Sequence, residues 1–319
     1  MLKKFLKILL ALVAVLLIAF AVFWFSRPVD VSFDELKATI PHSEYSKFVE
    51  IGGVKIHYQE KGTGTPLVLI HGYTSSVYTW KDLFEPLSQK YRVIALDLKG
   101  FGFSEKPDGD YSRRAQAEIV FGLLEHLKIE KAWLAGNSMG GETALNVALF
   151  HPEKVSGLIL IDSAGVKIAG RETLAPWYLQ VPVLGRVLTS LALTSDKIVR
   201  QGLEKSFYDD AKINDARVSF YYQPLKTRGG QLAAMRAREQ FNLYPVENDL
   251  NKTSVPALII WGAEDHIIPL EAGKKMNSEV KNSKLVTFEN CGHLPQEEMP
   301  EKTFQEMTNF IDGANQTIN

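Results

Sequence analysis

The stretch that most constrains the fold is 134–141, which reads L-A-G-N-S-M-G-G. The apolar run 131–135 predicts a buried strand, and the run of good helix formers 142–149 predicts a helix directly after it. A turn this sharp from strand to helix forces Ser138 into a strained backbone conformation with no room for neighbouring side chains, which explains the flanking glycines. We therefore predict a serine that stands clear of a sheet at the positive end of a helix.

A serine at neutral pH is a weak nucleophile, so chemistry at Ser138 requires a histidine and a carboxylate further along the chain. Two later strands supply them. The apolar run 255–262 is followed by Asp265, and the shorter run 285–288 is followed by His293. Both side chains come just past the carboxyl end of a strand, where open α/β sheets place their sites. We therefore expect Ser138, Asp265 and His293 to form a catalytic triad.

Three motifs now stand in a fixed order, namely G-N-S-M-G-G at Ser138, W-G-x-x-D-x-x-x-P at Asp265 and N-C-G-H at His293. In order and spacing they resemble the α/β-hydrolase family, and the resemblance covers about 48–311. It implies an α/β fold with a mostly parallel central sheet flanked by helices. It also implies a helical cap inserted after the sixth strand.

The same resemblance assigns roles to two strand-end loops. An H-G dipeptide follows the expected strand 66–70 and in the family begins the oxyanion loop. The backbone N–H groups of Tyr73 and Met139 are then expected to hold the carbonyl oxygen, while His71 braces the loop and is not the base. Asp97 opens a D-x-x-G-x-G-x-S signature, in which the family uses the aspartate to fix the loop.

Two residues compete with these assignments. Asp162 ends the expected strand 155–161, a position from which some members of the fold recruit their acid, so it rivals Asp265. The single cysteine, Cys291, excludes an internal disulfide and a multi-cysteine metal site. Its place two residues before His293 is compatible with a reactive thiol or with a small residue that fills space. We favour Asp265 as the acid and a space-filling role for Cys291.

The amino terminus carries three lysines within its first seven residues and then runs from 8 to 25 without a charged side chain. As a helix at ~1.5 Å per residue this run is roughly 27 Å long, close to a bilayer's hydrocarbon thickness of about 30 Å. The lysines against a lone Arg27 predict a cytoplasmic amino terminus and an extracytoplasmic catalytic domain. We expect 1–28 to be a retained membrane anchor. Secretion after signal-peptide cleavage before Val22 is the alternative.

The rest of the chain divides into four expected parts: a linker (29–47), the first part of the core (48–165), a helical cap (166–250) and the second part of the core (251–319). Strand and helix stop alternating within the cap, which indicates an insertion over the strand ends. The core is expected to begin with an antiparallel hairpin over 48–59. It is expected to end in a helix over 300–311, and the polar tail beyond is expected to fray.

Three residues are candidates for substrate binding. The most apolar patch of the cap runs from Trp177 and Tyr178 to Leu184 and is expected to line an acyl pocket, with contact to a bilayer or plain packing onto the core as alternatives. Leu294 follows His293 and offers apolar contact, whereas carbon–carbon bond hydrolases of this fold typically carry a tryptophan there. The chain is also similar to membrane-anchored monoacylglycerol lipases and bacterial lipases with the same N-C-G-H ending, which implies lipid esters.

These observations predict a serine hydrolase that cleaves a small lipophilic carboxylic ester through an acyl-enzyme on Ser138, without a metal or an organic cofactor. A carbon–carbon bond hydrolase of the same fold is one alternative, and a catalytically idle, membrane-tethered binding module is another. The chain has 36 Lys and Arg against 37 Asp and Glu, so no nucleic-acid partner is expected. Its 319 residues can bury one large core with an insertion.

Overall fold

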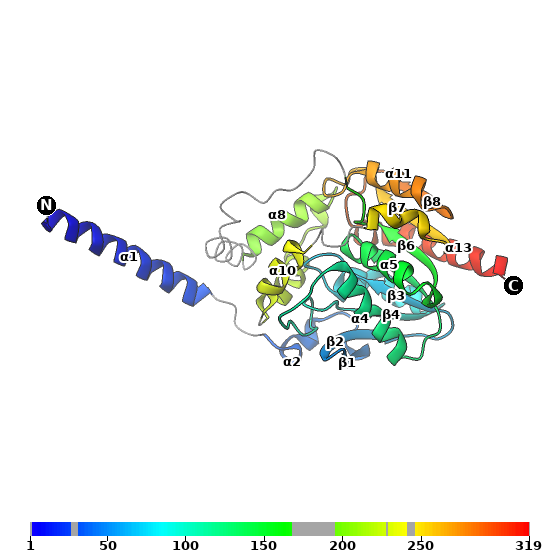
Figure 1. The fold of residues 1–319 in the computed structure, drawn as a ribbon, viewed down its shortest axis with the longest axis horizontal. Coiled ribbons are helices and arrows are strands. Elements are labelled where there is room, and N and C mark those ends of the chain that lie inside the picture. Colours follow the sequence, from blue (N-terminus) through cyan, green and yellow to red (C-terminus); the bar gives the residue numbers. More distant parts are fainter. Residues whose placement is uncertain (1, 27–30, 168–194, 228, 241–245, 319) are drawn as a thin grey trace.

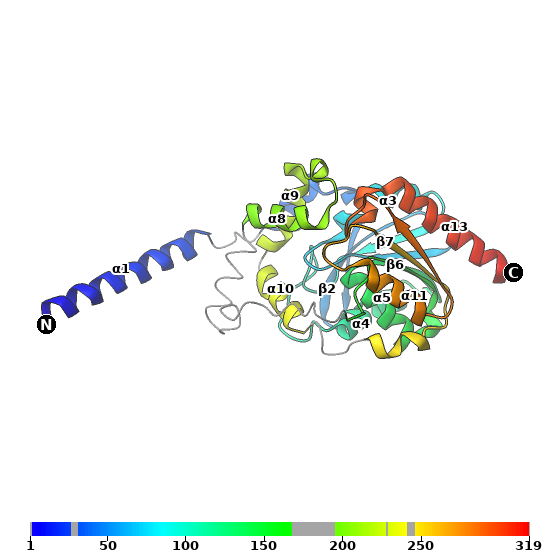
Figure 2. The same ribbon diagram turned by 90° about the horizontal axis from the view of Figure 1, so that it is seen from above.

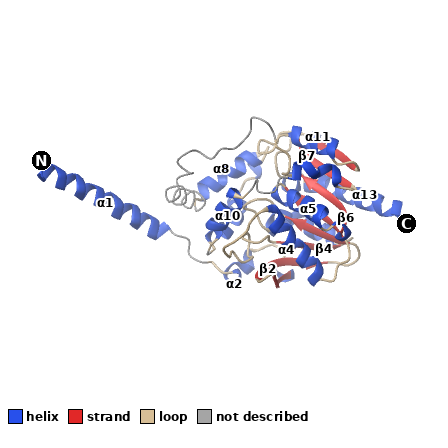
Figure 3. Cartoon of the chain, viewed as in Figure 1, coloured by secondary structure: helices blue, strands red, loops and turns tan. Residues whose placement is uncertain are grey.

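The computed structural model describes residues 2–26, 31–167, 195–227, 229–240 and 246–318. Its centre is an eight-stranded sheet with the order β1-β2-β4-β3-β5-β6-β7-β8 (Figures 1 and 3). Strand β2 pairs antiparallel with both β1 and β4, and all pairs among β3 to β8 are parallel. A mostly parallel sheet is what the family resemblance implied. The strands are β1 (Ser46–Ile51), β2 (Val54–Lys61), β3 (Pro66–Ile70), β4 (Arg92–Leu96), β5 (Ala132–Asn137), β6 (Val155–Ile161), β7 (Ala257–Gly262) and β8 (Ser283–Phe288).

Helices cover both faces of this sheet (Figure 2). Because the parallel strands β3 to β7 are buried on both faces, they appear in the sequence as nearly continuous apolar runs. One face carries α3 (Lys81–Ser88) and α13 (Pro300–Ile318), and the other carries α4 (Arg113–His126), α5 (Met139–Phe150) and α11 (Leu270–Glu279). The short helices are η1 (Lys37–Thr39), η2 (Ser43–Tyr45), η3 (Val77–Trp80), η4 (Pro152–Lys154), η5 (Asp210–Lys212), η6 (Gln223–Lys226), η7 (Val246–Lys252) and α12 (Pro295–Glu298).

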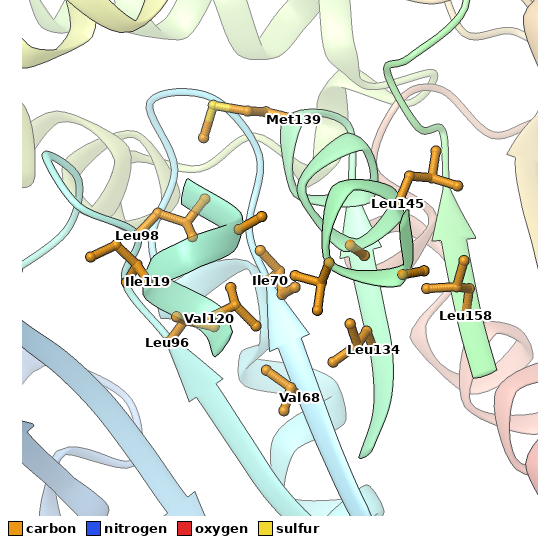
Figure 4. Packing of buried hydrophobic residues seen from close by; sticks show 14 of the residues in the cluster. Val68, Ile70, Leu96, Leu98, Ile119, Val120, Leu134, Met139, Leu145 and Leu158 are labelled. Carbon is orange, nitrogen blue, oxygen red and sulfur yellow. The ribbon is translucent and has the colours of Figure 1, made fainter. Parts of the chain in front are cut away.

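The core has two halves, one on each face of the sheet. Alternate residues of β3 point to opposite faces, so Val68 and Ile70 join one apolar cluster while Leu67 and Leu69 join the other. Figure 4 shows the first cluster, in which strand side chains meet those of α4 and α5, including Leu145. This packing fixes α5 against β5, and therefore fixes the turn between them that carries the candidate nucleophile.

The described part of the expected cap is helical and contains no strand. It comprises α8 (Asp196–Ser206), α9 (Asp215–Tyr222) and α10 (Gly230–Glu239), which follow β6 in the chain and lie beside one end of the sheet (Figures 1 and 2). A helical cap after the sixth strand is thus confirmed. The apolar patch with Trp177 and Tyr178 lies outside the described residues.

The segment expected to be a linker contains short helices where the structure describes it, and some of its side chains contact the core. Helix α2 (Phe33–Leu36) begins with a capping box between Ser32 and Glu35. The Phe33 ring lies 5.2 Å from that of Phe48 and 5.3 Å from that of Phe103. Elements of three or four residues cover about one helical period of 3.6 residues, so they are too short for a repeating apolar pattern to reveal them.

The prediction of a frayed carboxyl-terminal tail is wrong, because α13 continues to Ile318. The Asp312 carboxylate accepts a hydrogen bond from the Tyr91 hydroxyl at 2.8 Å and lies 3.2 Å from the Lys90 ammonium. Ala314 packs against the apolar cluster beneath the helix. Contacts with α3 and the loop after it therefore hold a segment whose own sequence is polar.

Helix α1 (Leu2–Ser26) stands apart from the folded body (Figure 1). Its segment Lys3–Val22 is long and apolar enough to cross a membrane, and none of that segment is buried. Length and composition alone do not separate a membrane anchor from a signal sequence, since both pass the same test.

Candidate active site

The turn between β5 and α5 holds Ser138 in a strained conformation. Its φ is 53°, in the left-handed region that residues other than glycine rarely adopt. A Cβ added to Gly136 would lie closer than 3.0 Å to the backbone of Gly140, and one added to Gly140 closer than 3.0 Å to the Ile70 carbonyl. The Ser138 N–H donates to the Ile161 carbonyl at 3.0 Å. The strained turn and the need for glycine on both sides were predicted and are confirmed.

His293 and Asp265 form a buried hydrogen-bonded pair beside this turn. The His293 Nδ1 lies 2.7 Å from Asp265 Oδ2. The other carboxylate oxygen accepts the N–H groups of Ile267 at 2.7 Å and Ile268 at 2.9 Å. Burial raises the pKa of Asp265, but the His293 charge and these hydrogen bonds outweigh it, so the pKa falls below its ordinary value. An ionised Asp265 favours a proton on Nδ1 and leaves Nε2 as the basic nitrogen.

Asp162 is a second buried carboxyl close to this pair. Its Oδ1 accepts the Gly262 N–H at 3.0 Å, and its carboxyl group interacts with that of Asp265. Burial, and then the charge of Asp265, raise the pKa of Asp162 well above its ordinary value. Two carboxyls this close do not both ionise, so Asp265 carries the charge and Asp162 is a neutral acid. Because His293 pairs with Asp265, the geometry favours Asp265 over its rival.

These three side chains also have the spacing of a metal site, since one donor atom from each lies within 4.8 Å of the others. However, both oxygens of Asp265 already accept hydrogen bonds, one of them from the His293 ring. A neutral Asp162 is also a poor ligand, because metals bind the deprotonated carboxylate. The donor set therefore fits an acid–base pair better than it fits a cation.

The expected oxyanion loop lies against the nucleophile. A Cβ added to Gly72 would lie 3.3 Å from the Ser138 Cβ, so the loop backbone approaches the serine closely. The hydroxyl of Tyr73 donates to the Ala234 carbonyl at 2.8 Å, which ties the loop to the cap helix α10. Met139 is the first residue of α5. Tyr73 follows Gly72, which approaches Ser138, and Met139 follows Ser138 itself. Both residues are therefore close to the serine, and their role in an oxyanion hole stays a prediction.

Two residues brace the loops as expected. The His71 ring is buried, with Nε2 accepting the Leu98 N–H at 3.0 Å and Nδ1 at 2.7 Å from the Gly72 carbonyl. Burial lowers the pKa of His71, which favours the neutral ring that this pattern requires. Asp97 accepts the Val77 N–H at 2.7 Å. The bracing role of His71 and the loop-fixing role of Asp97 are confirmed.

Three groups that the sequence analysis missed hold the loop of His293. The Asn137 side-chain amide donates to the His293 carbonyl at 3.1 Å. The His293 N–H donates to the Ser206 carbonyl of the cap at 2.6 Å, and the Glu298 carboxylate accepts the Gly292 N–H at 2.8 Å. Asn137 could have been found from the sequence, because its polar side chain directly precedes Ser138 at the end of an apolar strand. A backbone carbonyl such as that of Ser206 has no sequence signal.

A buried ion pair joins the same region to the cap. Arg217 of α9 has its Nε 3.1 Å from the Oε2 of Glu297 in α12, and the Tyr221 hydroxyl donates to the Oε1 of the same carboxylate. Thr79 also donates to this Oε1, at 2.7 Å. The side chain of Glu297 is fully buried. Helix α9 of the cap is therefore fixed to the element that follows His293.

We expect Glu297→Gln to lower the free energy of unfolding by about 3 kcal/mol or more, because it leaves the buried Arg217 charge without its carboxylate partner. Urea unfolding followed by circular dichroism measures this change. Lys252→Met is the control, since Lys252 and Asp249 form an ion pair whose side chains are 68% and 45% exposed. Its effect should stay below about 1 kcal/mol. Equal losses in the two variants would contradict the assignment of Glu297 to a buried ion pair.

The Ser138 and His293 side chains line one cavity of about 350 Å³ under the cap. None of the described residues around this cavity is Asp, Glu, Lys or Arg. Its apolar lining includes Ile198, Val199, Leu203, Leu225, Ile267 and Leu294. Cys291 is fully buried and does not line this cavity, and burial raises the pKa of its thiol. The space-filling role of Cys291 is therefore supported over a reactive one.

The chain belongs to the α/β-hydrolase family, because the family model for the alpha/beta hydrolase fold matches residues 65–300. It is 34% identical over 82% of its length to the uncharacterized hydrolase YugF of Bacillus subtilis (strain 168), covering 96% of that protein. It is 31% identical over 83% of its length to a 2-hydroxy-6-oxo-6-(2'-aminophenyl)hexa-2,4-dienoic acid hydrolase of Metapseudomonas resinovorans, covering 90% of that protein. The crystal structure of a membrane phospholipase A, a bacterial virulence factor, matches with a TM-score of 0.75 and 30% identity over 97% of this chain and 99% of that one.

Proposed function

We propose that this hydrolase cleaves carboxylic esters of lipids or of small lipophilic alcohols. The observation that carries the proposal is the cavity that Ser138 and His293 share, whose described lining is largely apolar and carries no Asp, Glu, Lys or Arg. A neutral ester loses little hydration there, and each buried methylene of its acyl chain gains about 0.8 kcal/mol. Leu294 adds apolar contact directly beside the proposed base.

The proposed mechanism is acyl transfer to water. His293 takes the Ser138 proton while the serine oxygen attacks the ester carbonyl, and the backbone amides of Tyr73 and Met139 bind the oxyanion. Asp265 stabilises the imidazolium, which then protonates the leaving alcohol. Water, deprotonated by the same histidine, releases the acyl group from Ser138.

The curated relatives favour a second candidate, a carbon–carbon bond hydrolase, since several of them are named for dienoate or 2-hydroxymuconate semialdehyde substrates. Such a substrate carries a carboxylate at neutral pH. Burying that charge is costly unless a cationic or strongly donating group pairs with it. The described lining of the cavity offers no lysine or arginine, and Leu294 stands where carbon–carbon hydrolases of this fold typically carry tryptophan. The membrane phospholipase A likeness supports the ester proposal instead.

We expect kcat/KM on p-nitrophenyl esters to rise at least about tenfold from acetyl to decanoyl, because the longer chain buries more methylenes in the cavity. Monoacylglycerols should also be cleaved. Val199→Asn, which adds a polar group to the lining, should lower the decanoyl rate more than the acetyl rate. A flat or falling profile, or faster cleavage of a dienoate than of any ester, would favour the carbon–carbon candidate.

We also propose that α1 anchors the chain in a membrane by a single span, with the catalytic domain on the extracytoplasmic side. The apolar segment Lys3–Val22 is unburied, which leaves it available to lipid. The likeness to the membrane phospholipase A extends over 97% of this chain, so it takes in most of α1. The three lysines before the apolar run support a cytoplasmic amino terminus.

The anchor predicts that the full chain stays in the membrane pellet after a carbonate wash, because an inserted helix is held by burial of its apolar surface rather than by charge. Immunoblotting of pellet and supernatant measures the partition. A peripheral membrane protein serves as the control that the wash must release. Full-length protein in the supernatant would contradict the anchor, and a mature amino terminus at Val22 would support a cleaved signal peptide instead.

A further inference from the structure

A second cavity, of about 270 Å³, lies on the other side of α9 from the active-site cavity. Four parts of the chain enclose it: the segment after the anchor, the short helix η3 with the residue before it, Phe103 of the loop after β4, and α9 with the start of η6. Its described lining has no charged side chain, and its polar members are hydroxyls and one amide. Its apolar walls include Leu36, Ile40, Val77, Tyr78, Phe220 and Pro224.

This cavity is separate from the proposed catalytic one. Adjacent residues line different cavities. Tyr221 and Ser75 line the active-site cavity, whereas Phe220 and Ser76 line the second cavity. The Tyr78 and Phe220 rings stack with centroids 4.2 Å apart. A molecule in the second cavity is therefore outside the site that contains Ser138, and the proposed reaction makes no use of this space.

The size of the second cavity and its uncharged lining indicate what kind of molecule it can bind. An uncharged, mostly apolar cavity binds an alkyl chain through about 0.8 kcal/mol for each buried methylene. Small-molecule sites usually measure ≈ 300–1,000 Å³, so a space of about 270 Å³ fits one chain end rather than a larger ligand. A helix with its side chains is about 10–12 Å across, which makes α1 of a second copy too wide to enter.

The cavity also lies close to the expected membrane surface. Helix α1 ends at Ser26 and α2 begins at Phe33. The six residues between them span at most about 3.6 Å each, or roughly 22 Å in all. Leu36, Thr39 and Ile40, which line the cavity, follow within seven residues, and Thr39 is exposed. From this placement we propose that the second cavity holds the end of one alkyl chain of a membrane lipid. The proposal rests on the anchor proposed above and not on the chemistry of Ser138.

Photo-crosslinking of the full chain tests the proposal. Ser138→Ala protein is reconstituted into phosphatidylcholine vesicles that contain phosphatidylcholine with a diazirine at the last carbon of one acyl chain. After irradiation, mass spectrometry locates the labelled peptides. We expect label on the peptides that contain 33–40 and 216–224. A parallel arm uses a free fatty acid with the same diazirine, and label from that probe alone would overturn a membrane lipid as the source.

Two matched variants fill one cavity each. Ser219→Leu, in α9, extends a side chain into the second cavity and should lower its labelling at least tenfold. Gly202→Leu extends into the active-site cavity, where an added Cβ meets nothing within 4 Å, and should leave labelling of the second cavity unchanged. Circular dichroism checks that both variants fold. Equal labelling in Ser219→Leu, or label confined to peptides of the active-site cavity, would overturn the proposal. Because crosslinking does not require turnover, the result is independent of whether Ser138 is a nucleophile.

Discussion

Ser138→Ala and His293→Ala are each expected to lower kcat/KM on the preferred ester by at least about 10³-fold. The first removes the attacking oxygen, and the second removes the base that activates it, which a buried pair with Asp265 holds beside the nucleophile turn. Steady-state kinetics on a medium-chain ester measure both losses. A variant that keeps more than about a tenth of the wild-type rate would remove its residue from the mechanism.

The double variant gives the matching control. When two residues act in the same catalytic step, removing the second after the first costs little further rate. The double variant Ser138→Ala/His293→Ala should therefore have about the same kcat/KM as either single variant. Thermal unfolding should stay close to that of the wild type for Ser138→Ala, because the substitution removes only an oxygen. Rates that fall multiplicatively in the double variant would mean that the two residues act separately.

The two buried aspartates should differ sharply in their effects. Asp265→Asn replaces the charged partner of His293 and is expected to lower kcat by about 10²–10⁴-fold, because an amide cannot stabilise the imidazolium. Asp162→Asn should change kcat by less than about threefold, since a neutral carboxyl and an amide have nearly the same shape and charge. Kinetics on the same ester compare the two variants. A crippled Asp162→Asn beside an active Asp265→Asn would reverse their roles.

The parts of the fold with strong local patterns could be predicted from the sequence. Apolar runs located β3 and β6 at their observed bounds, because strands buried on both faces need a continuous run of apolar residues. The glycines around Ser138 predicted the strained turn, and the structure leaves no space for a Cβ at Gly136 or Gly140. Asp265 and His293 could be predicted because each follows a strand and belongs to a motif. In the structure the His293 Nδ1 lies 2.7 Å from the Asp265 Oδ2.

The rest of the site depends on contacts that sequence patterns do not record. His293 is held by the Ser206 carbonyl of the cap and by the Asn137 amide, both far from it in the chain. The charge state of Asp162 depends on how close the fold places it to Asp265. The helical tail beyond residue 311 is held by contacts with Tyr91 and Lys90, so its own polar composition was misleading.

The most direct test of the central claim is to trap the acyl-enzyme. Wild-type protein mixed with p-nitrophenyl decanoate and quenched in acid within milliseconds is digested, and its peptides are weighed by mass spectrometry. The proposed function predicts one decanoyl group on the peptide that contains Ser138, and none in Ser138→Ala. Nitrophenol release without an acylated peptide, or a decanoyl group on another residue, would contradict it.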